Sequence, residues 1–462
     1  MTGNNDSPIT ETISRWAADL TFDQLSKDAV RQAKRFLLDS VACALGGFQQ
    51  PDVAIALGVL SEVAAPGPAT LIGSGKKLDV VHAAFANALM IRCMDYNDVY
   101  WKQDPCHPSD IFPAAMACAE RQRSDGKELI VGLVLGHEFE QRLCEAAFPG
   151  IRERGWHHAT LTAFAAPIVA GRMLHLSSAQ MQHAIGISAS ARCTLGAVAA
   201  GELTMMKNTV DPMAVESGVF AALLAEKGYT GPGHVIDGKE GLVDVLGPEW
   251  RLNVLTEGLG ESWRITQCGM KYFPTEALTH TPVSAVLDLV REYNLESDLI
   301  REVHILTTSR GANILSDASK YDPRSKETAD HSLPYCIAAA IAEGQVTPRQ
   351  FAMDKIMDPT IRAQLNKIKV DADPVIESLF PNLQRAVVTI TTGDGRVLSK
   401  SVDFPKGDPR NPLSDQEIED KFHALAEPVM SSDARYKLLD SVWNLERQTN
   451  VTSLFELMKA DK

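Results

Sequence analysis

The sequence predicts a mainly α fold, in which a large all-helical domain carries a smaller α+β domain inserted before the C-terminal helices. From Ile9 to about Gly201, apolar residues recur three and four positions apart, as on the buried face of a helix. Between about Trp263 and Asp403 apolar and polar residues alternate instead, which is typical of strands. After Asp403 the helical pattern returns. We therefore expect a helical domain at 1–262, an α+β domain at 263–404, and a segment at 405–462 that rejoins the helical domain.

The first helices are rich in alanine and glycine, and these small residues permit close packing between helices. The first long helix, 29–47, ends on Gly46 and Gly47, which we expect to form a left-handed C-cap. Turn residues at 229–235 follow the last of these predicted helices and end it. The other predicted helices are 81–94, 112–120, 129–148, 160–174, 178–200 and 212–227.

The α+β domain is predicted from two alternating segments. Residues 302–309 read as one strand, and 386–404 as a hairpin that turns at Gly393, Asp394 and Gly395. Beyond it, Ser414 and Glu417 have the spacing of a capping box at the start of a C-terminal helix.

Composition excludes several classes of protein. A net charge of −14, without a cluster of Lys and Arg, argues against a nucleic-acid partner. No apolar run reaches the ~18 to 20 residues of a membrane span. The N-terminus lacks the pattern of a signal or transit peptide, so we expect a cytoplasmic protein. An anionic ligand would need a local group of cations.

The eight cysteines are scattered, without a CxxC pair or zinc-finger spacing. His157 and His158 beside Glu153 come nearest to a metal site, but adjacent helical residues point about 100° apart. We expect no metal and no cofactor.

Titratable residues concentrate in the segment MDYNDVYWKQDPCHPSD, at 94–110, directly after an apolar helix. Ser109 or Asp110 suits a cap of the following helix. That explanation does not cover Asp95 or His107, which could equally form an acid/base pair in which the carboxylate orients the imidazole. Asn97 in the same segment and Ser109 are candidates for binding a substrate.

Three more polar residues adjoin apolar helices. His157 precedes one, where the helix dipole lowers the pKa of a histidine and favours an anion. Lys207 lies just before another, although a lone lysine is more often a solvated surface charge. Tyr335, with His331, precedes an alanine-rich helix, where a tyrosine is most often a core ring with a satisfied hydroxyl.

These residues stand in segments that together resemble the 2-methylcitrate dehydratase and cis-aconitate decarboxylase family, also called the MmgE/PrpD family. The matching segments follow the same order along nearly the whole chain. They include AKRFLLDSVACALGG, MDYNDVYWKQDPCHPSD, RGWHHATLTAFAA, MMKNTVDPMAVESGVFAALLAEKGYTGP, MKYFPTEALTHTP, KETADHSLPYCIAAAIAEGQVTPRQF and GDPRNPLSDQEIEDKF.

The resemblance implies a homodimer whose α+β domain serves as a lid over a metal-free active site. It also implies that the cleft is lined by Asp95, His107, His157, Lys207 and Tyr335, with Lys271 contributed by the lid. The interval from Asp95 to His107, followed by Pro-Ser-Asp, and the segment ETADHSLPY look like the dehydratase version.

Dehydrating a 2-hydroxy tricarboxylate requires a base for a carbon-bound proton, an acid for the hydroxyl, and cations for the carboxylates. We therefore predict a metal-independent lyase that dehydrates 2-methylcitrate or citrate, with His107 oriented by Asp95 as an acid/base residue. In this scheme Lys207 and Lys271 bind carboxylates, and Tyr335 and His157 handle the other proton. A decarboxylase or epimerase of the same family, or a non-catalytic binding protein, is the alternative.

Overall fold

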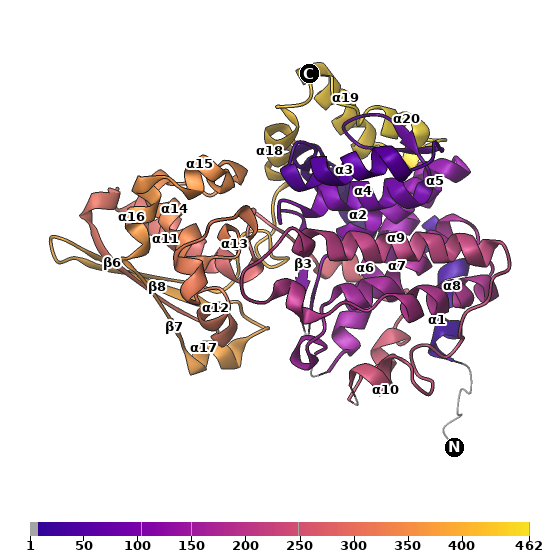
Figure 1. Ribbon diagram of the computed structural model, residues 1–462, viewed down its shortest axis with the longest axis horizontal. Coiled ribbons are helices and arrows are strands. Elements are labelled where there is room, and N and C mark those ends of the chain that lie inside the picture. The colour runs from indigo at the N-terminus through magenta and orange to yellow at the C-terminus, as the bar shows by residue number, and fades with distance from the viewer. Residues whose placement is uncertain (1–7, 103, 149, 248, 462) are drawn as a thin grey trace.

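A computed structural model describes residues 8–102, 104–148, 150–247 and 249–461, and it shows a large helical part beside a smaller α+β part (Figure 1). Each part has its own hydrophobic core. The first and last described helices lie on the helical part, and the smaller part, coloured orange, is formed by the middle of the C-terminal half. The predicted fold class is confirmed. We call the two parts the helical domain and the lid.

In the helical domain α7 and α9 pack against each other, with α4, α6 and α8 around them. Gly218 of α9 permits this contact, because a Cβ there would lie 2.6 Å from the Cβ of Ala166. The helices are α1 (Ile9–Asp19), α2 (Lys27–Gly47), α3 (Pro51–Val63), α4 (Val80–Arg92), α5 (Phe112–Gln122), α6 (Gly126–Ala146), α7 (Ala159–Met173), α8 (Ser178–Ala191), α9 (Met206–Glu226) and α10 (Leu242–Leu246), with a short ribbon of β1 (Ala69–Thr70) and β2 (Lys77–Leu78).

Two helix boundaries differ from the prediction by more than a few residues. The eighth helix ends at Ala191 rather than near 200, and α9 begins at Met206, with Pro212 inside it rather than at its start. Gly46 and Gly47 also serve a different purpose from the one predicted. Neither has a positive φ, and a Cβ on Gly47 would lie 2.2 Å from the Met90 carbonyl oxygen, so this glycine allows α2 to approach α4.

The lid is built around a four-stranded sheet of order β7-β6-β8-β9, in which β6 is parallel to β7 and antiparallel to β8. The predicted hairpin is confirmed, with Gly395 at φ +88° in its turn. The helix α11 packs on β8, β9 and α14. The strands are β6 (Ile300–Thr307), β7 (Ile368–Ala372), β8 (Ala386–Thr392) and β9 (Val397–Val402), and the helices are α11 (His280–Glu292), α12 (Ser309–Asn313), α13 (Lys326–Ala329), α14 (Leu333–Glu343), α15 (Met353–Ile356), α16 (Pro359–Leu365) and α17 (Pro374–Leu379).

A small sheet of order β4-β3-β5 lies at the junction of the two domains. It consists of β3 (Asp98–Trp101), β4 (Pro105–Cys106) and β5 (Gly269–Met270). Residues 263–270, which the sequence assigned to the lid, pack in the helical core; apart from Trp101 of β3, the lid core begins at Phe273. The pairing of β5 with β3 explains this difference, because it holds the chain on the helical domain for a few more residues.

The C-terminal segment returns to the helical domain as α18 (Asp415–Ala426), α19 (Ser432–Trp443) and α20 (Thr452–Glu456), drawn in yellow in Figure 1. The predicted capping box of Ser414 and Glu417 starts α18, which packs on α2. Among the described helices, none alone is long and apolar enough to cross a membrane; α2 and α3 reach that length only together, with an 84° bend between them.

Candidate active site

A cavity of about 70 Å³ lies where the helical domain meets the lid, and we call it the junction cavity. Five of the predicted site residues line it together: Asp95, His107, His157, Lys207 and Lys271. They come from four separate segments of the chain. Its other polar or charged lining residues are Arg92, Trp101, Arg152, His158, Glu276, Arg310 and His331.

Asp95 is the centre of a buried group of cations. Its Oδ1 accepts from Lys207 Nζ at 2.8 Å, and its Oδ2 accepts from Lys271 Nζ at 2.7 Å. Arg92 donates to the same carboxylate. Burial alone would raise the pKa of Asp95, but these cations outweigh it and hold that pKa well below its usual range. The backbone of Asp95 is left-handed, with φ +50°, a strained conformation that is common at functional sites.

His107 is oriented by the backbone and not by Asp95, which corrects the predicted acid/base pair. Its Nδ1 lies 2.7 Å from the carbonyl oxygen of Asp98. Since a carbonyl only accepts, Nδ1 carries the proton and Nε2 has a free lone pair. Burial, with the charge of Arg92, holds the pKa of His107 well below its usual value, so the ring is neutral near pH 7.

His157 and His158 lie side by side, with ring centroids 3.9 Å apart. The Nδ1 of His157 accepts from the backbone N–H of Ala159 at 3.2 Å, which leaves the proton on Nε2. Burial and the neighbouring His158 lower the pKa of His157 well below its usual value. His158, which the sequence did not single out as a site residue, lies 3.3 Å from the carboxylate of Asp211 in α9.

Asn97 and Ser109 do not line the junction cavity. Both are fully buried behind it, where Asn97 Nδ2 donates to Ser109 Oγ at 2.9 Å and Ser109 Oγ donates to Asp98 Oδ1 at 2.6 Å. Asn97 also donates to Asp110 Oδ1 at 2.9 Å, so neither Ser109 nor Asp110 caps α5 as the sequence suggested. Asn97 and Ser109 instead hold the side chain of Asp98 in place, and the backbone carbonyl of Asp98 orients His107.

Tyr335 also lies outside the junction cavity. It belongs to the lid core, and its hydroxyl donates to the Gln350 carbonyl oxygen at 2.6 Å. Burial raises its pKa. The same segment contributes His331 to the cavity instead; burial, with the charge of Lys207, lowers the pKa of that imidazole to about 4. His331 precedes Ser332, the N-cap of α14, whereas Tyr335 lies in the first turn of that helix, so the helical spacing of four residues does not place them on one face.

The sequence also missed Arg92 and Glu276. Arg92 stands alone in the apolar run at 82–94, and a single charge in such a run indicates a buried partner. Its Nε lies 3.4 Å from Asp110 and 3.9 Å from Asp211. Glu276 accepts from the Leu278 N–H at 2.6 Å, and burial raises its pKa, so it can hold a proton.

Among the described residues, two groups have metal-binding geometry. In the first, ligand atoms of His157, His158 and Asp211 lie within 4.8 Å of one another, but the positive Arg92 stands 3.9 Å from that carboxylate. The second group consists of Asp98, His137 and Cys268, all of which are buried. The centroid of the His137 ring lies 4.6 Å from that of the Phe36 ring and 5.3 Å from that of the Phe112 ring.

Several proteins of known activity are similar to this chain over most of its length. Cis-aconitate decarboxylase of Aspergillus terreus is 26% identical, over 98% of this chain and 96% of its own length. Cis-aconitate decarboxylase of Homo sapiens is 26% identical, over 98% and 94%. The 2-methylcitrate dehydratase of Cupriavidus necator is 26% identical, over 82% and 81%.

Two family models match in sequence order. The MmgE/PrpD N-terminal domain matches residues 11–254, within the helical domain, and the MmgE/PrpD C-terminal domain matches residues 273–446. The second match begins at Phe273, where the lid core begins. Since these matches cover most of the sequence in the order that the fold requires, this chain belongs to the MmgE/PrpD family.

Proposed function

We propose that the protein is a lyase that acts on a tricarboxylate or a related polycarboxylate, and that it dehydrates 2-methylcitrate or citrate to the aconitate-type alkene. The observation that carries this proposal is the charge of the junction cavity. Its five cations exceed its two carboxyl groups, Asp95 and Glu276, and the cations are Arg92, Arg152, Lys207, Lys271 and Arg310. In a protein of net charge −14, such a local excess suits a polyanion.

The chemistry follows from the protonation states. His107 presents a free Nε2 lone pair and acts as the base for the carbon-bound proton. We assign Glu276, whose pKa is raised by burial, as the acid: it gives its proton to the hydroxyl, which leaves as water while the carbon–carbon double bond forms. Lys207 and Lys271 bind substrate carboxylates and stabilise the enolate-like charge that develops. His157 donates through Nε2. Glu276 thus takes the role first given to Tyr335.

The junction cavity is small in this structure. Its volume of about 70 Å³ holds about five to seven waters, whereas citrate has about 13 non-hydrogen atoms. The substrate therefore enters only when the lid moves away from the helical domain. Among the described residues, the ion pair of Arg310 with Glu153 crosses this boundary.

Decarboxylation of cis-aconitate is the second candidate. The relatives named cis-aconitate decarboxylase match 98% of this chain, whereas the Cupriavidus necator dehydratase matches 82%. The same cations would hold the substrate, and a cavity acid would protonate the carbon from which carbon dioxide leaves.

A substrate panel distinguishes these activities. Purified protein, treated exhaustively with EDTA, is incubated with 2-methylcitrate, citrate and cis-aconitate, and the products are identified by NMR. We expect an alkene from a hydroxy acid. A product that has lost one carboxyl group establishes the decarboxylase. Turnover that disappears with EDTA and returns with added metal contradicts side-chain catalysis.

A further inference from the structure

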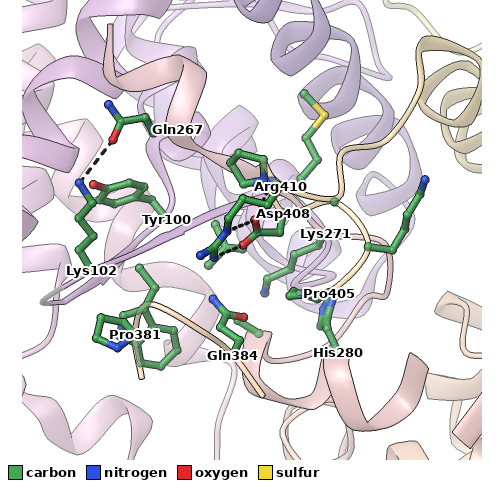
Figure 2. A pocket seen from close by; sticks show the side chains of 18 of the residues that line it. Tyr100, Lys102, Gln267, Lys271, His280, Pro381, Gln384, Pro405, Asp408 and Arg410 are labelled. Carbon is green, nitrogen blue, oxygen red and sulfur yellow. Dashed lines mark hydrogen bonds and ion pairs between the residues drawn. The ribbon is translucent and has the colours of Figure 1, made fainter. Parts of the chain in front are cut away.

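A second and larger cavity, of about 460 Å³, adjoins the junction cavity and is shown in Figure 2. We call it the cationic pocket. Its walls come from the helical domain, from the lid and from the segment 405–410 that joins them. It shares with the junction cavity only Val99, Trp101, Lys271 and Ala277. Its charged lining residues are Lys102, Arg251, Lys271, Lys406, Asp408 and Arg410.

Three of the five cations are already paired with carboxylates. Arg410 pairs with Asp408 at 2.8 Å, as Figure 2 shows, and Lys406 pairs with Glu417 at 2.9 Å. The ammonium of Lys271 is bound to Asp95. His280 also lines the pocket, but burial lowers its pKa to about 3, so it adds no charge near pH 7.

The other two cations give the pocket its positive charge. The guanidinium of Arg251 lies 4.2 Å from the ring centre of Phe148 and has no ion-pair partner in the described part of the chain. Lys102 and Arg264 share the carboxylate of Glu145. Lys102 Nζ lies 3.4 Å and Arg264 Nε lies 3.0 Å from Glu145 Oε1, so two cations face one anion. About two positive charges are left without a counterion of their own.

Uncharged donors complete the lining. The indole nitrogen of Trp101 is buried and has no hydrogen-bond partner among the described residues. A buried N–H without a partner is costly. Gln384 of the lid and Gln267 of the helical domain project beside Arg410 and Lys102 (Figure 2).

We propose that the cationic pocket is a second binding site, for a compact polyanion that carries phosphate or carboxylate groups. Two positive charges without counterions call for at least two negative charges on the ligand. A volume of about 460 Å³ lies within the usual range of small-molecule sites, roughly 300–1,000 Å³. Because the pocket has walls from both domains, the bound anion holds the lid against the helical domain. The proposal does not depend on the reaction in the junction cavity.

The test is calorimetric titration of the full chain with inorganic pyrophosphate and, separately, with tricarballylate. The doubly substituted variant Lys102→Gln/Arg251→Gln should bind pyrophosphate at least tenfold more weakly than the wild type, and it should lose the cationic-pocket site for tricarballylate while it keeps the site in the junction cavity. Arg251→Lys, which keeps the charge, should retain most of the affinity. Both side chains are exposed, so melting curves should stay close to the wild type.

Two controls locate the anion. The variant Arg15→Gln/Lys227→Gln makes the same change of charge at exposed positions that do not line the pocket, and it should bind normally. Lys207→Met removes a cation of the junction cavity only, and it should leave the affinity for pyrophosphate unchanged. Affinity that is unaffected by Lys102→Gln/Arg251→Gln, loss of pyrophosphate binding in Lys207→Met, or no binding to the wild type would each overturn the proposal. If tricarballylate alone depends on the pocket, the ligand is a carboxylate; if pyrophosphate alone does, it is a phosphate.

Discussion

The ammonium of Lys271 lies 2.7 Å from the carboxylate of Asp95, although 176 residues separate them in the sequence. The pairing of β5 with β3 favours this contact, because Asp95 lies shortly before β3 and Lys271 directly follows β5. Lys421 of α18 reinforces it by donating to the carbonyl oxygens of Tyr96 and Lys271 at 2.6 and 3.1 Å. The charged centre of the site is therefore assembled from three distant parts of the chain.

Lys207→Met tests whether this centre binds carboxylates. A charge-assisted hydrogen bond is worth about 1.5 to 3 kcal/mol, so the variant should bind tricarballylate in the junction cavity about 10- to 150-fold more weakly. Asp95 keeps two other cations, so the fold should survive. Calorimetry in the Lys102→Gln/Arg251→Gln background measures this cavity alone. Unchanged affinity would remove Lys207 from the substrate site.

His107→Gln should lower kcat by about 10²-fold or more, because general bases contribute 10² to 10⁴. Glutamine can still donate to the Asp98 carbonyl, so the melting temperature should change little. The matched control is His183→Gln, since His183 also directs Nδ1 at a backbone carbonyl, 3.1 Å away, but lies outside the junction cavity. Wild-type turnover in His107→Gln would exclude this residue as the base.

Tyr335→Phe should leave kcat unchanged and lower stability by about 1 kcal/mol, through loss of the bond to the Gln350 carbonyl. This reverses the expectation from the sequence, in which Tyr335 handled a proton. Steady-state kinetics and urea unfolding of the variant check it. A hundredfold lower kcat with normal stability would restore Tyr335 to the mechanism.

The sequence predicted elements and motifs better than the directions of side chains. Helical periodicity and the hairpin turn are local, and they predicted most of the helices, β8 and β9. The sequence could not predict which of two neighbouring polar residues faces the junction cavity. Tyr335 and His331 are four residues apart, at the start of one helix, yet one is in the lid core and the other lines the junction cavity. The orientation of His107 depends on a carbonyl, which no side-chain pattern reveals.

Folding stability should fall as the pH is lowered below about 6.5, partly because of His331. Burial and Lys207 lower its folded pKa to about 4, whereas the unfolded value is about 6.5. The unfolded chain therefore binds the proton more tightly, and stability is lost between pH 6.5 and 4. Between pH 7 and 5 the loss from this group is about 2 kcal/mol.

His331→Gln should remove that part of the pH dependence, as measured by urea unfolding at pH 7 and pH 5. The exposed His175 provides the control, because His175→Gln should retain the wild-type dependence. Equal pH dependence in His331→Gln and in the wild type would show that His331 is not held neutral by the fold.

The helix α3 presents an apolar stripe to solvent. Ile55, Val59 and Val63 are 60%, 57% and 61% exposed, and their spacing of four residues places them on one face. The helix contains two acidic residues and no basic one, unlike helices that lie on anionic membranes. We therefore propose that the stripe mediates the expected homodimer, with a second copy of the chain as its partner.

Sedimentation velocity tests this interface with Ile55→Asp/Val59→Asp. The wild type should sediment as a dimer and the variant as a monomer, because two aspartates on each copy would bring four like charges into an apolar contact. Val375→Asp is the matched control, since Val375 of the lid is 65% exposed but lies far from α3 in sequence and domain, and this variant should stay dimeric. The substituted side chains are exposed, so all three proteins should melt at similar temperatures. A monomeric wild type would contradict the dimer, and a dimeric double variant would place its interface elsewhere.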